Sequence, residues 1–184
     1  MPTNLWFISD THFFHRNMVE KFTEADGTRV RPEFSSVEEC DTAMAERWNA
    51  VVKPGDKVYH LGDVSFKDGE KLLTLVTSLN GRKRLVLGNH DKLTTGSALL
   101  RCFEKVTLWR GWKEHGFTCT HIPMLLDKIR WGGVNVHGHT HRALMADPRY
   151  INVCVERRNY TPVHLDEILA EISLIGGEGC PPFI

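Results

Sequence analysis

The sequence lacks the features of a secreted, disulfide-bonded or membrane protein. No run approaches the roughly eighteen apolar residues that a membrane-spanning helix requires. The first ten residues, M-P-T-N-L-W-F-I-S-D, lack the basic segment and long apolar core of a signal peptide. The five cysteines are odd in number, widely spaced and without a C-x-x-C pair, which argues against a zinc knuckle or a disulfide framework. Free thiols in a reducing compartment are the simpler interpretation, so we expect a cytoplasmic protein with no membrane partner.

The sequence also has no excess of charge of either sign. Lysine plus arginine and aspartate plus glutamate number 23 each, so no overall field favours nucleic acid as a partner. A nuclease would need a local basic patch. The candidates for such a patch are Arg29, Arg31, Arg82, Lys83 and Arg84.

The length and composition indicate one globular domain. The chain has 184 residues, of which 41% are hydrophobic and 25% charged, values that are ordinary for a domain with a substantial core. We expect this domain over residues 1–175 and a loosely held tail over 176–184. The polar segment 20–35 is too long for a plain turn, and it is either a lid or substrate loop or an ordinary surface excursion.

The order of apolar segments predicts a mixed α/β fold. Ser36 and Glu39 have the spacing of a capping box that begins a helix. The first half alternates strands and helices, with strands at 4–9, 57–61 and 84–87 and helices over about 36–51 and 72–79. The second half is mostly short strands, near 104–108, 117–120, 133–137, 150–155 and 161–165, before a helix over 166–172.

Short polar motifs stand where most of these strands end. They are Asp10 and His12 in S-D-T-H, Asp63 in L-G-D-V, Asn89, His90 and Asp91 in G-N-H-D, His121 in T-H-I-P, and His139 and His141 in G-H-T-H. Residues i and i+2 of an extended chain face the same side, so each D-x-H or H-x-H pair can reach one ion. Asp63 can bridge two ions because a carboxylate has two oxygens. The pattern therefore favours a hydrolase with two metal ions.

The ligand types indicate which metals would bind. Imidazole mixed with oxygen suits manganese, iron, zinc or nickel better than calcium or magnesium. We expect two divalent ions, with manganese as the first choice.

The order of these motifs resembles that of the calcineurin-like metallophosphoesterase superfamily, and in particular its compact bacterial and phage-type members. The superfamily pattern is D-x-H, G-D, G-N-H-D/E, a single H and G-H-x-H, and no core position is missing here. The resemblance implies a four-layer α-β-β-α sandwich, with two mixed sheets flanked by helices. It also implies that Asp10, His12, Asp63 and His141 hold the first metal, while Asp63, Asn89, His121 and His139 hold the second.

The hypothesis for function is a metal-dependent phosphoesterase, with a phosphodiesterase first and a phosphomonoesterase second. A hydroxide held between the ions would attack phosphorus in line. His90 would give a proton to the leaving group, and Asp91 would orient its imidazole and favour the protonated form. His15 and Arg16 are candidates to bind the phosphate of a small ester substrate.

Two alternatives and two further histidines remain. A nuclease on the same site would need the basic patch described above. A non-catalytic metal-binding scaffold is the other alternative, but such relatives typically lose ligand or acid positions, and all are present here. His60 is interpreted as a strand histidine of the core, and His137 as a core residue or a neighbour of the ligands.

Overall fold

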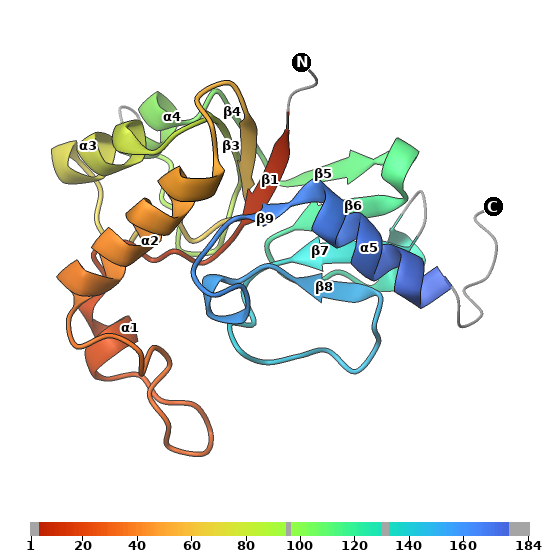
Figure 1. The fold of residues 1–184 in the computed structure, drawn as a ribbon, viewed down its shortest axis with the longest axis horizontal. Coiled ribbons are helices and arrows are strands. Elements are labelled where there is room, and N and C mark those ends of the chain that lie inside the picture. The colour runs from red at the N-terminus through yellow and green to blue at the C-terminus, as the bar shows by residue number, and fades with distance from the viewer. Residues whose placement is uncertain (1–3, 95–96, 130–132, 177–184) are drawn as a thin grey trace.

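The structure, a computed structural model, describes residues 4–94, 97–129 and 133–176. Its strands form two mixed sheets (Figure 1). Buried apolar residues of both sheets belong to one hydrophobic core. The first sheet has the strand order β4-β3-β2-β1-β9 and the second the order β5-β6-β7-β8. The predicted α/β class with two mixed sheets flanked by helices is confirmed. The part of the expected tail after Gly176 lies outside the described residues.

The first sheet is parallel except at one edge, where β9 runs antiparallel to β1. Its strands are β1 (Leu5–Ile8), β2 (Lys57–His60), β3 (Arg82–Val86), β4 (Lys105–Thr107) and β9 (Val163–His164). In the second sheet β5 runs antiparallel to β6, and β6, β7 and β8 are parallel. Its strands are β5 (Trp109–Trp112), β6 (Phe117–Thr120), β7 (Val134–His137) and β8 (Tyr150–Asn152).

β1 shows why an unbroken apolar run forms a central strand. Successive strand side chains point to opposite faces, and both faces of this sheet are covered. Phe7 lies in the core between the sheets, where its ring centroid is 5.9 Å from that of Tyr59 and 5.4 Å from that of Trp112. Ile8 lies in the other core, beneath the helices. Burial on both faces is typical of parallel sheets.

The helices cover the sheets on both sides of the molecule. They are α1 (Arg16–Glu20), α2 (Val37–Val51), α3 (Glu70–Ser78), α4 (Ala98–Cys102) and α5 (Leu165–Gly176). α2, α3 and α4 bury apolar residues in the core that contains Ile8, whereas α5 adds Ile168 to the core between the sheets. None of the described helices has both the length and the apolar character to cross a membrane.

α2 begins at the predicted cap. The Ser36 hydroxyl accepts a hydrogen bond from the backbone N–H of Glu39 at 3.1 Å. The Glu39 carboxylate accepts from the backbone N–H and the hydroxyl of Ser35 instead of returning to Ser36. The helix therefore starts where the capping box predicts, although the reciprocal bond is displaced by one residue.

Among the described strands and α-helices, three were not predicted, namely β5, α1 and α4. The two helices have five residues each, which is too short to show a helical period. β5 is an edge strand whose Trp109 and Arg110 are exposed, so no buried run marks it. The strand expected over 150–155 ends at Asn152, and a 3-10 helix (Val155–Arg157) follows.

The two sheets join at the end of β1. The N–H of Ser9 donates to the Val153 carbonyl at 3.1 Å, and the Ser9 carbonyl accepts from the N–H of Val155 at 3.1 Å. This parallel bridge gives β1, β2, β6 and β7 the same direction. Their carboxyl ends therefore open onto one edge of the molecule.

Candidate metal centre

The predicted ligand motifs meet at this edge as two groups of side chains. The first group is Asp10, His12 and His141, and the second group is Asp63, His121 and His139. Within each group the potential ligand atoms all lie within 4.8 Å of one another. Each group combines residues that follow strands of both sheets.

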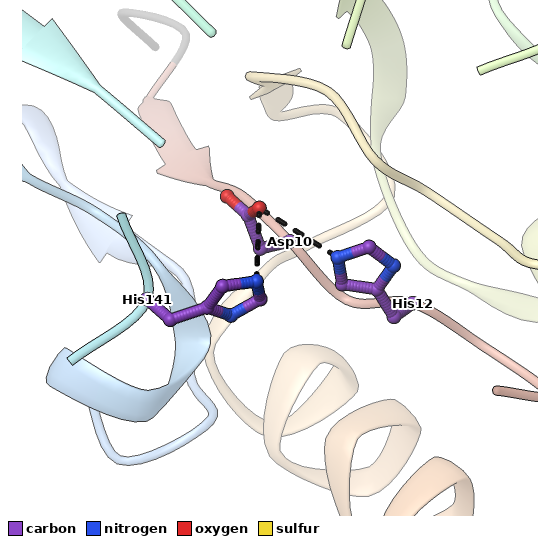
Figure 2. Close-up of side chains that lie close together, drawn as sticks. All are labelled: Asp10, His12 and His141. Atoms are coloured by element: carbon purple, nitrogen blue, oxygen red, sulfur yellow. Dashed lines mark ion pairs between the residues drawn. The ribbon is translucent and has the colours of Figure 1, made fainter. Parts of the chain in front are cut away.

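The first group surrounds one oxygen of Asp10, as Figure 2 shows. Asp10 Oδ1 lies 3.8 Å from His12 Nε2 and 3.9 Å from His141 Nε2. The other oxygen, Oδ2, accepts the backbone N–H of His139 at 2.8 Å. Burial, and then the neighbouring His141, lower the pKa of His12 to about 2. Its neutral imidazole therefore keeps a lone pair available to a cation.

The second group is ordered by His121. His121 Nδ1 lies 2.7 Å from the Leu61 carbonyl oxygen, to which it donates. This leaves Nε2 facing Asn89 Oδ1 at 2.8 Å and Asp63 Oδ2 at 3.3 Å. A hydrogen bond from the remote ring nitrogen is the usual way to fix the tautomer of a metal-ligating histidine. The geometry therefore adds Asn89 to the second group.

Asp63 stands between the two groups. Its Oδ2 lies 3.6 Å from His12 Nε2 as well as 3.3 Å from His121 Nε2. Its Oδ1 accepts the backbone N–H of His90 at 2.8 Å. Burial alone would raise the pKa of Asp63, but the contact with His121 lowers it to about 2. An ionised oxygen thus faces both groups.

The backbone at these positions is strained. Among the described residues, eight that are not glycine have positive φ, and five of them are proposed ligands. These are Asp10, His12, Asp63, His139 and His141, with φ between 46° and 68°. Residues other than glycine rarely adopt positive φ, and backbone strain of this kind clusters at functional sites. The surrounding contacts must therefore hold the ligand turns in place.

Two glycines of the motifs pack directly against the aspartates. A Cβ at Gly138 would lie 2.5 Å from Asp10 Oδ2, and a Cβ at Gly88 would lie 2.3 Å from Asp63 Oδ1. Both distances are shorter than any ordinary contact. Glycine is needed at both positions because the backbone lies so close to the aspartate carboxylate that no side chain fits between them.

The role predicted for Asp91 is wrong. The hydrogen bonds that its carboxylate makes in the structure run to backbone N–H groups, each at 2.9 Å, and none of them reaches His90. The donors are Asp63, Val64 and Gly88. Asp91 therefore joins the turn of Asp63 to the G-N-H-D loop. It does not orient the His90 imidazole.

His15 and Arg16 have different surroundings. The His15 ring lies 5.6 Å from that of His12 and stacks on Phe66, with centroids 4.2 Å apart. Arg16 is exposed and pairs with Glu20 one helical turn away, at 2.6 Å. In the described structure it has no contact with either group. Of these two candidates, only His15 stands beside the proposed ligands.

His60 and His137 lie in the core, outside both groups. His60 Nε2 is 3.0 Å from the Thr11 hydroxyl, and burial lowers the pKa of this histidine to about 3. His137 Nδ1 is 2.8 Å from the Gly138 carbonyl, and burial lowers its pKa too. The interpretation of both as core histidines agrees with these contacts.

Two buried charged residues near the first group were not anticipated. Glu156 Oε1 lies 3.2 Å from His141 Nδ1 and is bound by the guanidinium of Arg31 at 2.8 and 2.9 Å. Only 1% of the Arg31 surface is exposed. The one available signal in the sequence was a glutamate at the end of the apolar run I-N-V-C-V-E.

Two of the basic residues considered for a nucleic-acid patch are buried. Arg31 is buried against Glu156. Lys83 is also buried and donates to two backbone carbonyls at 2.6 and 3.0 Å, while Arg82 pairs with Glu104 at 2.7 Å. Burial removes Arg31 and Lys83 from any such patch, whereas Arg29 and the paired Arg82 are exposed.

The two groups fit divalent transition-metal ions. Each offers imidazole nitrogens together with carboxylate oxygens, the mixture that such ions prefer. Asp10 Oδ1 and His12 Nε2 are buried atoms without a hydrogen-bond partner in the described structure. Buried polar atoms are normally satisfied, and a cation between these two would satisfy both.

Comparisons with known proteins agree with this geometry. The family model of the calcineurin-like phosphoesterases matches residues 3–171. The uncharacterized protein MJ1445 of Methanocaldococcus jannaschii is 34% identical over 174 residues, covering 90% of this chain and 89% of that protein. The gene 66 protein of Mycobacterium phage D29 is 30% identical over 184 residues, covering 82% of this chain and 87% of its own.

A solved structure shares the fold. The crystal structure of a protein of unknown function from Aquifex aeolicus, AQ665, matches with a TM-score of 0.70 and 26% identity, covering 91% of this chain and 98% of that one. The family model spans nearly all of the domain, and the two groups of potential metal ligands lie within the residues it matches. The chain therefore belongs to the calcineurin-like phosphoesterase family and is a metal-dependent phosphoesterase.

Proposed function

We propose that the protein is a phosphodiesterase with two divalent metal ions that acts on a small phosphodiester. The observation that carries this proposal is the position of Asp63 Oδ2, 3.6 Å from His12 Nε2 and 3.3 Å from His121 Nε2. One carboxylate oxygen that faces both ligand groups could bridge a pair of closely spaced ions.

The ligand sets divide around this shared residue. Asp10, His12, Asp63 and His141 would hold one ion, and Asp63, Asn89, His121 and His139 the other. The nitrogen and oxygen mixture supports manganese as the first ion to test, ahead of iron, zinc and nickel. Bound here, the two ions would activate a water as nucleophile and stabilise charge on the phosphoryl oxygens.

Two observations support His90 as the residue that would protonate the leaving group. Its backbone N–H is held by Asp63 Oδ1, and its exposed ring lies 5.7 Å from that of His12. It also lines a cavity of about 160 Å³ with Phe66, Lys67 and Lys92 among its neighbours. A leaving group in this cavity would place its oxygen within reach of the His90 imidazole, which would donate the proton.

The charge around the groups supports a diester over a monoester. A monoester brings a second negative charge to the phosphoryl group, and proteins commonly meet such a charge with arginine. Lys67 and Lys92 line the cavity proposed for the leaving group, and among the contacts that the structure describes no arginine or lysine side chain makes an ion pair or hydrogen bond with a side chain of either group. A singly charged diester needs no such partner.

The test is hydrolysis of paired chromogenic substrates by metal-stripped protein reloaded with single ions. We expect turnover of bis(p-nitrophenyl) phosphate to exceed that of p-nitrophenyl phosphate, with manganese most active. Higher turnover of the monoester would reverse the substrate assignment. No turnover of either ester with any ion would remove the proposed activity.

The acid role of His90 has its own test. His90→Ala should retain both ions and lose turnover most severely with poor leaving groups, because these need the proton most. His115→Ala is the matched control, since His115 lies on the turn before β6, at the end of that strand opposite His121. Equal losses for good and poor leaving groups would exclude His90 as the general acid.

A further inference from the structure

Arg31 lies at the base of the 20–35 excursion, directly beneath the first group. Its Nη2 donates to the Asp10 carbonyl at 2.7 Å, and its Nη1 donates to the Thr11 carbonyl at 3.0 Å. These carbonyls belong to the turn that carries Asp10 and His12. One buried side chain from a distant segment therefore holds the backbone of two proposed ligands.

The same guanidinium holds Glu156, which contacts the third member of the group. Nε and Nη2 of Arg31 lie 2.9 and 2.8 Å from Glu156 Oε1. That oxygen is 3.2 Å from His141 Nδ1, so the other ring nitrogen of His141 faces Asp10. A planar guanidinium can bind a carboxylate and two carbonyls at once, which a lysine ammonium on a flexible stem cannot do in the same geometry.

The turns that these contacts hold are strained. Asp10, His12 and His141 have φ of 59°, 46° and 47°. Such conformations persist only where the surroundings enforce them. In the second group His121 is oriented by a backbone carbonyl, that of Leu61. The Arg31–Glu156 ion pair contacts members of the first group, whereas in the second group the buried Asp91 carboxylate accepts backbone N–H groups of the Asp63 turn.

We propose that Arg31 and Glu156 are positioning residues for the first metal ion. Arg31 fixes the turn of Asp10 and His12 through its backbone carbonyls, and Glu156 fixes the ring of His141. This inference rests on the proposed function only in assuming that the first group binds an ion. The 20–35 excursion would then stabilise the geometry of the site through Arg31.

Other contacts fasten the same segment at its base. Arg142, next to His141, donates to the Val30 carbonyl at 2.9 Å and pairs with Glu33 at 2.7 Å. The Tyr160 hydroxyl donates to Glu33 at 2.8 Å. Figure 1 shows the loop that follows α1 projecting beside that helix, and the isolated bridge between Thr23 and Arg29 lies within this excursion. These contacts favour a brace over the lid considered from the sequence.

The test is calorimetric titration of the metal-free, full-length protein with Mn²⁺. Glu156→Gln keeps the shape of the side chain and removes the charge that binds Arg31. We expect it to weaken one of two binding events about 10- to 100-fold, the usual effect of losing a partner behind a ligand. The dissociation constant of the other Mn²⁺-binding event should change less than about threefold. Repeating the titration in a His139→Ala background, which disables the second group, should show that the weakened event belongs to the first group.

Two further variants separate positioning from general stability. Arg31→Lys keeps the positive charge but loses the planar guanidinium that binds Glu156 and the two backbone carbonyls. It should therefore weaken the same Mn²⁺-binding event and leave the other nearly unchanged. Arg29→Lys, on the same excursion with an exposed side chain, should leave both events unchanged. Arg31→Lys leaves Glu156 buried beside a poorer partner and can fail to fold, but the nearly isosteric Glu156→Gln still decides the question.

The outcomes separate this inference from the proposed function. Unchanged affinities in Glu156→Gln, or equal weakening of both events with a lower unfolding temperature, would overturn the positioning role and leave the proposed activity intact. A wild-type protein that binds two ions but hydrolyses no ester would remove the proposed activity. The selective effect of Glu156→Gln would then still stand.

Discussion

Replacing Gly138 by alanine should displace Asp10 and disable the first group. A Cβ at this position would lie 2.0 Å from Ser9 Oγ and 2.5 Å from Asp10 Oδ2. Neither neighbour can move freely. Ser9 Oγ donates to the Leu61 carbonyl at 2.9 Å, and Asp10 Oδ2 accepts the His139 N–H at 2.8 Å. The new methyl group must therefore shift the carboxylate or the strand end.

The size of the effect follows from these contacts. Forcing one carbon into a packed interior costs about 1–3 kcal/mol. Losing the buried hydrogen bond of Ser9 adds about 1 kcal/mol. We expect the free energy of unfolding of the metal-free protein to fall by about 3 kcal/mol. For a chain of this length, that corresponds to a drop in Tm of about 10 °C.

Urea unfolding of the metal-free protein and metal content after reloading measure the two consequences separately. Gly55→Ala is the matched control, because its Cβ would meet nothing within 4 Å, and its stability should change by less than about 0.5 kcal/mol. Adding Ser9→Gly to Gly138→Ala should recover stability but not the first ion, since the overlap with Asp10 remains. A Gly138→Ala protein with wild-type stability and two bound ions would refute the packing reasoning.

Three other outcomes are expected. Asp91→Asn replaces an acceptor of backbone N–H groups by a buried donor, so urea unfolding should show a loss of about 3 kcal/mol, and unchanged stability would contradict this role. Burial raises the pKa of Asp41 to about 7, so the folded state favours the protonated carboxyl. The contribution of Asp41 to the free energy of unfolding is therefore complete below about pH 4 and is lost as the pH rises through 7. Asp41→Asn can still accept the Phe14 N–H, and its stability relative to wild type should rise by about 2–4 kcal/mol as the pH is raised from 5 to 8; a relative stability that falls over this range would contradict the sign. Arg16→Ala should leave kcat/KM within about twofold of wild type, because Arg16 is paired with Glu20 at the surface, and a large rise in KM would restore its role with phosphate.

Much of the candidate site could be predicted because its residues follow strand ends. Apolar runs located β1, β2, β6 and β7, and parallel strands bring their carboxyl ends to one edge. That is sufficient to place Asp10 near Asp63 in the first sheet, whereas His121 reaches them only because the Ser9–Cys154 bridge aligns the second sheet with the first. The Ser36 cap likewise predicted the start of α2, because capping is a local interaction.

The remaining contacts depend on tertiary packing that no local pattern contains. Arg31 and Glu156 are 125 positions apart and pair only after both sheets have formed. In the sequence Arg31 is one of several surface-like charges, so it was assigned to a basic patch. Asp91 was paired with the adjacent His90, but both of its oxygens are occupied by amides of other turns. Adjacency in sequence was a poor guide to which way the side chain points.

Because each ligand group takes members from both sheets, neither half of the chain contains a complete binding site. A cut near Leu108, between β4 and β5, would leave Asp10, His12 and Asp63 on one fragment and His121, His139 and His141 on the other. Metal ions would then act as a cross-link between the fragments, and tight binding would appear only when they reassociate. In the intact protein the same cross-link opposes independent opening of the two sheets, so an occupied centre should make unfolding more cooperative as well as less favourable.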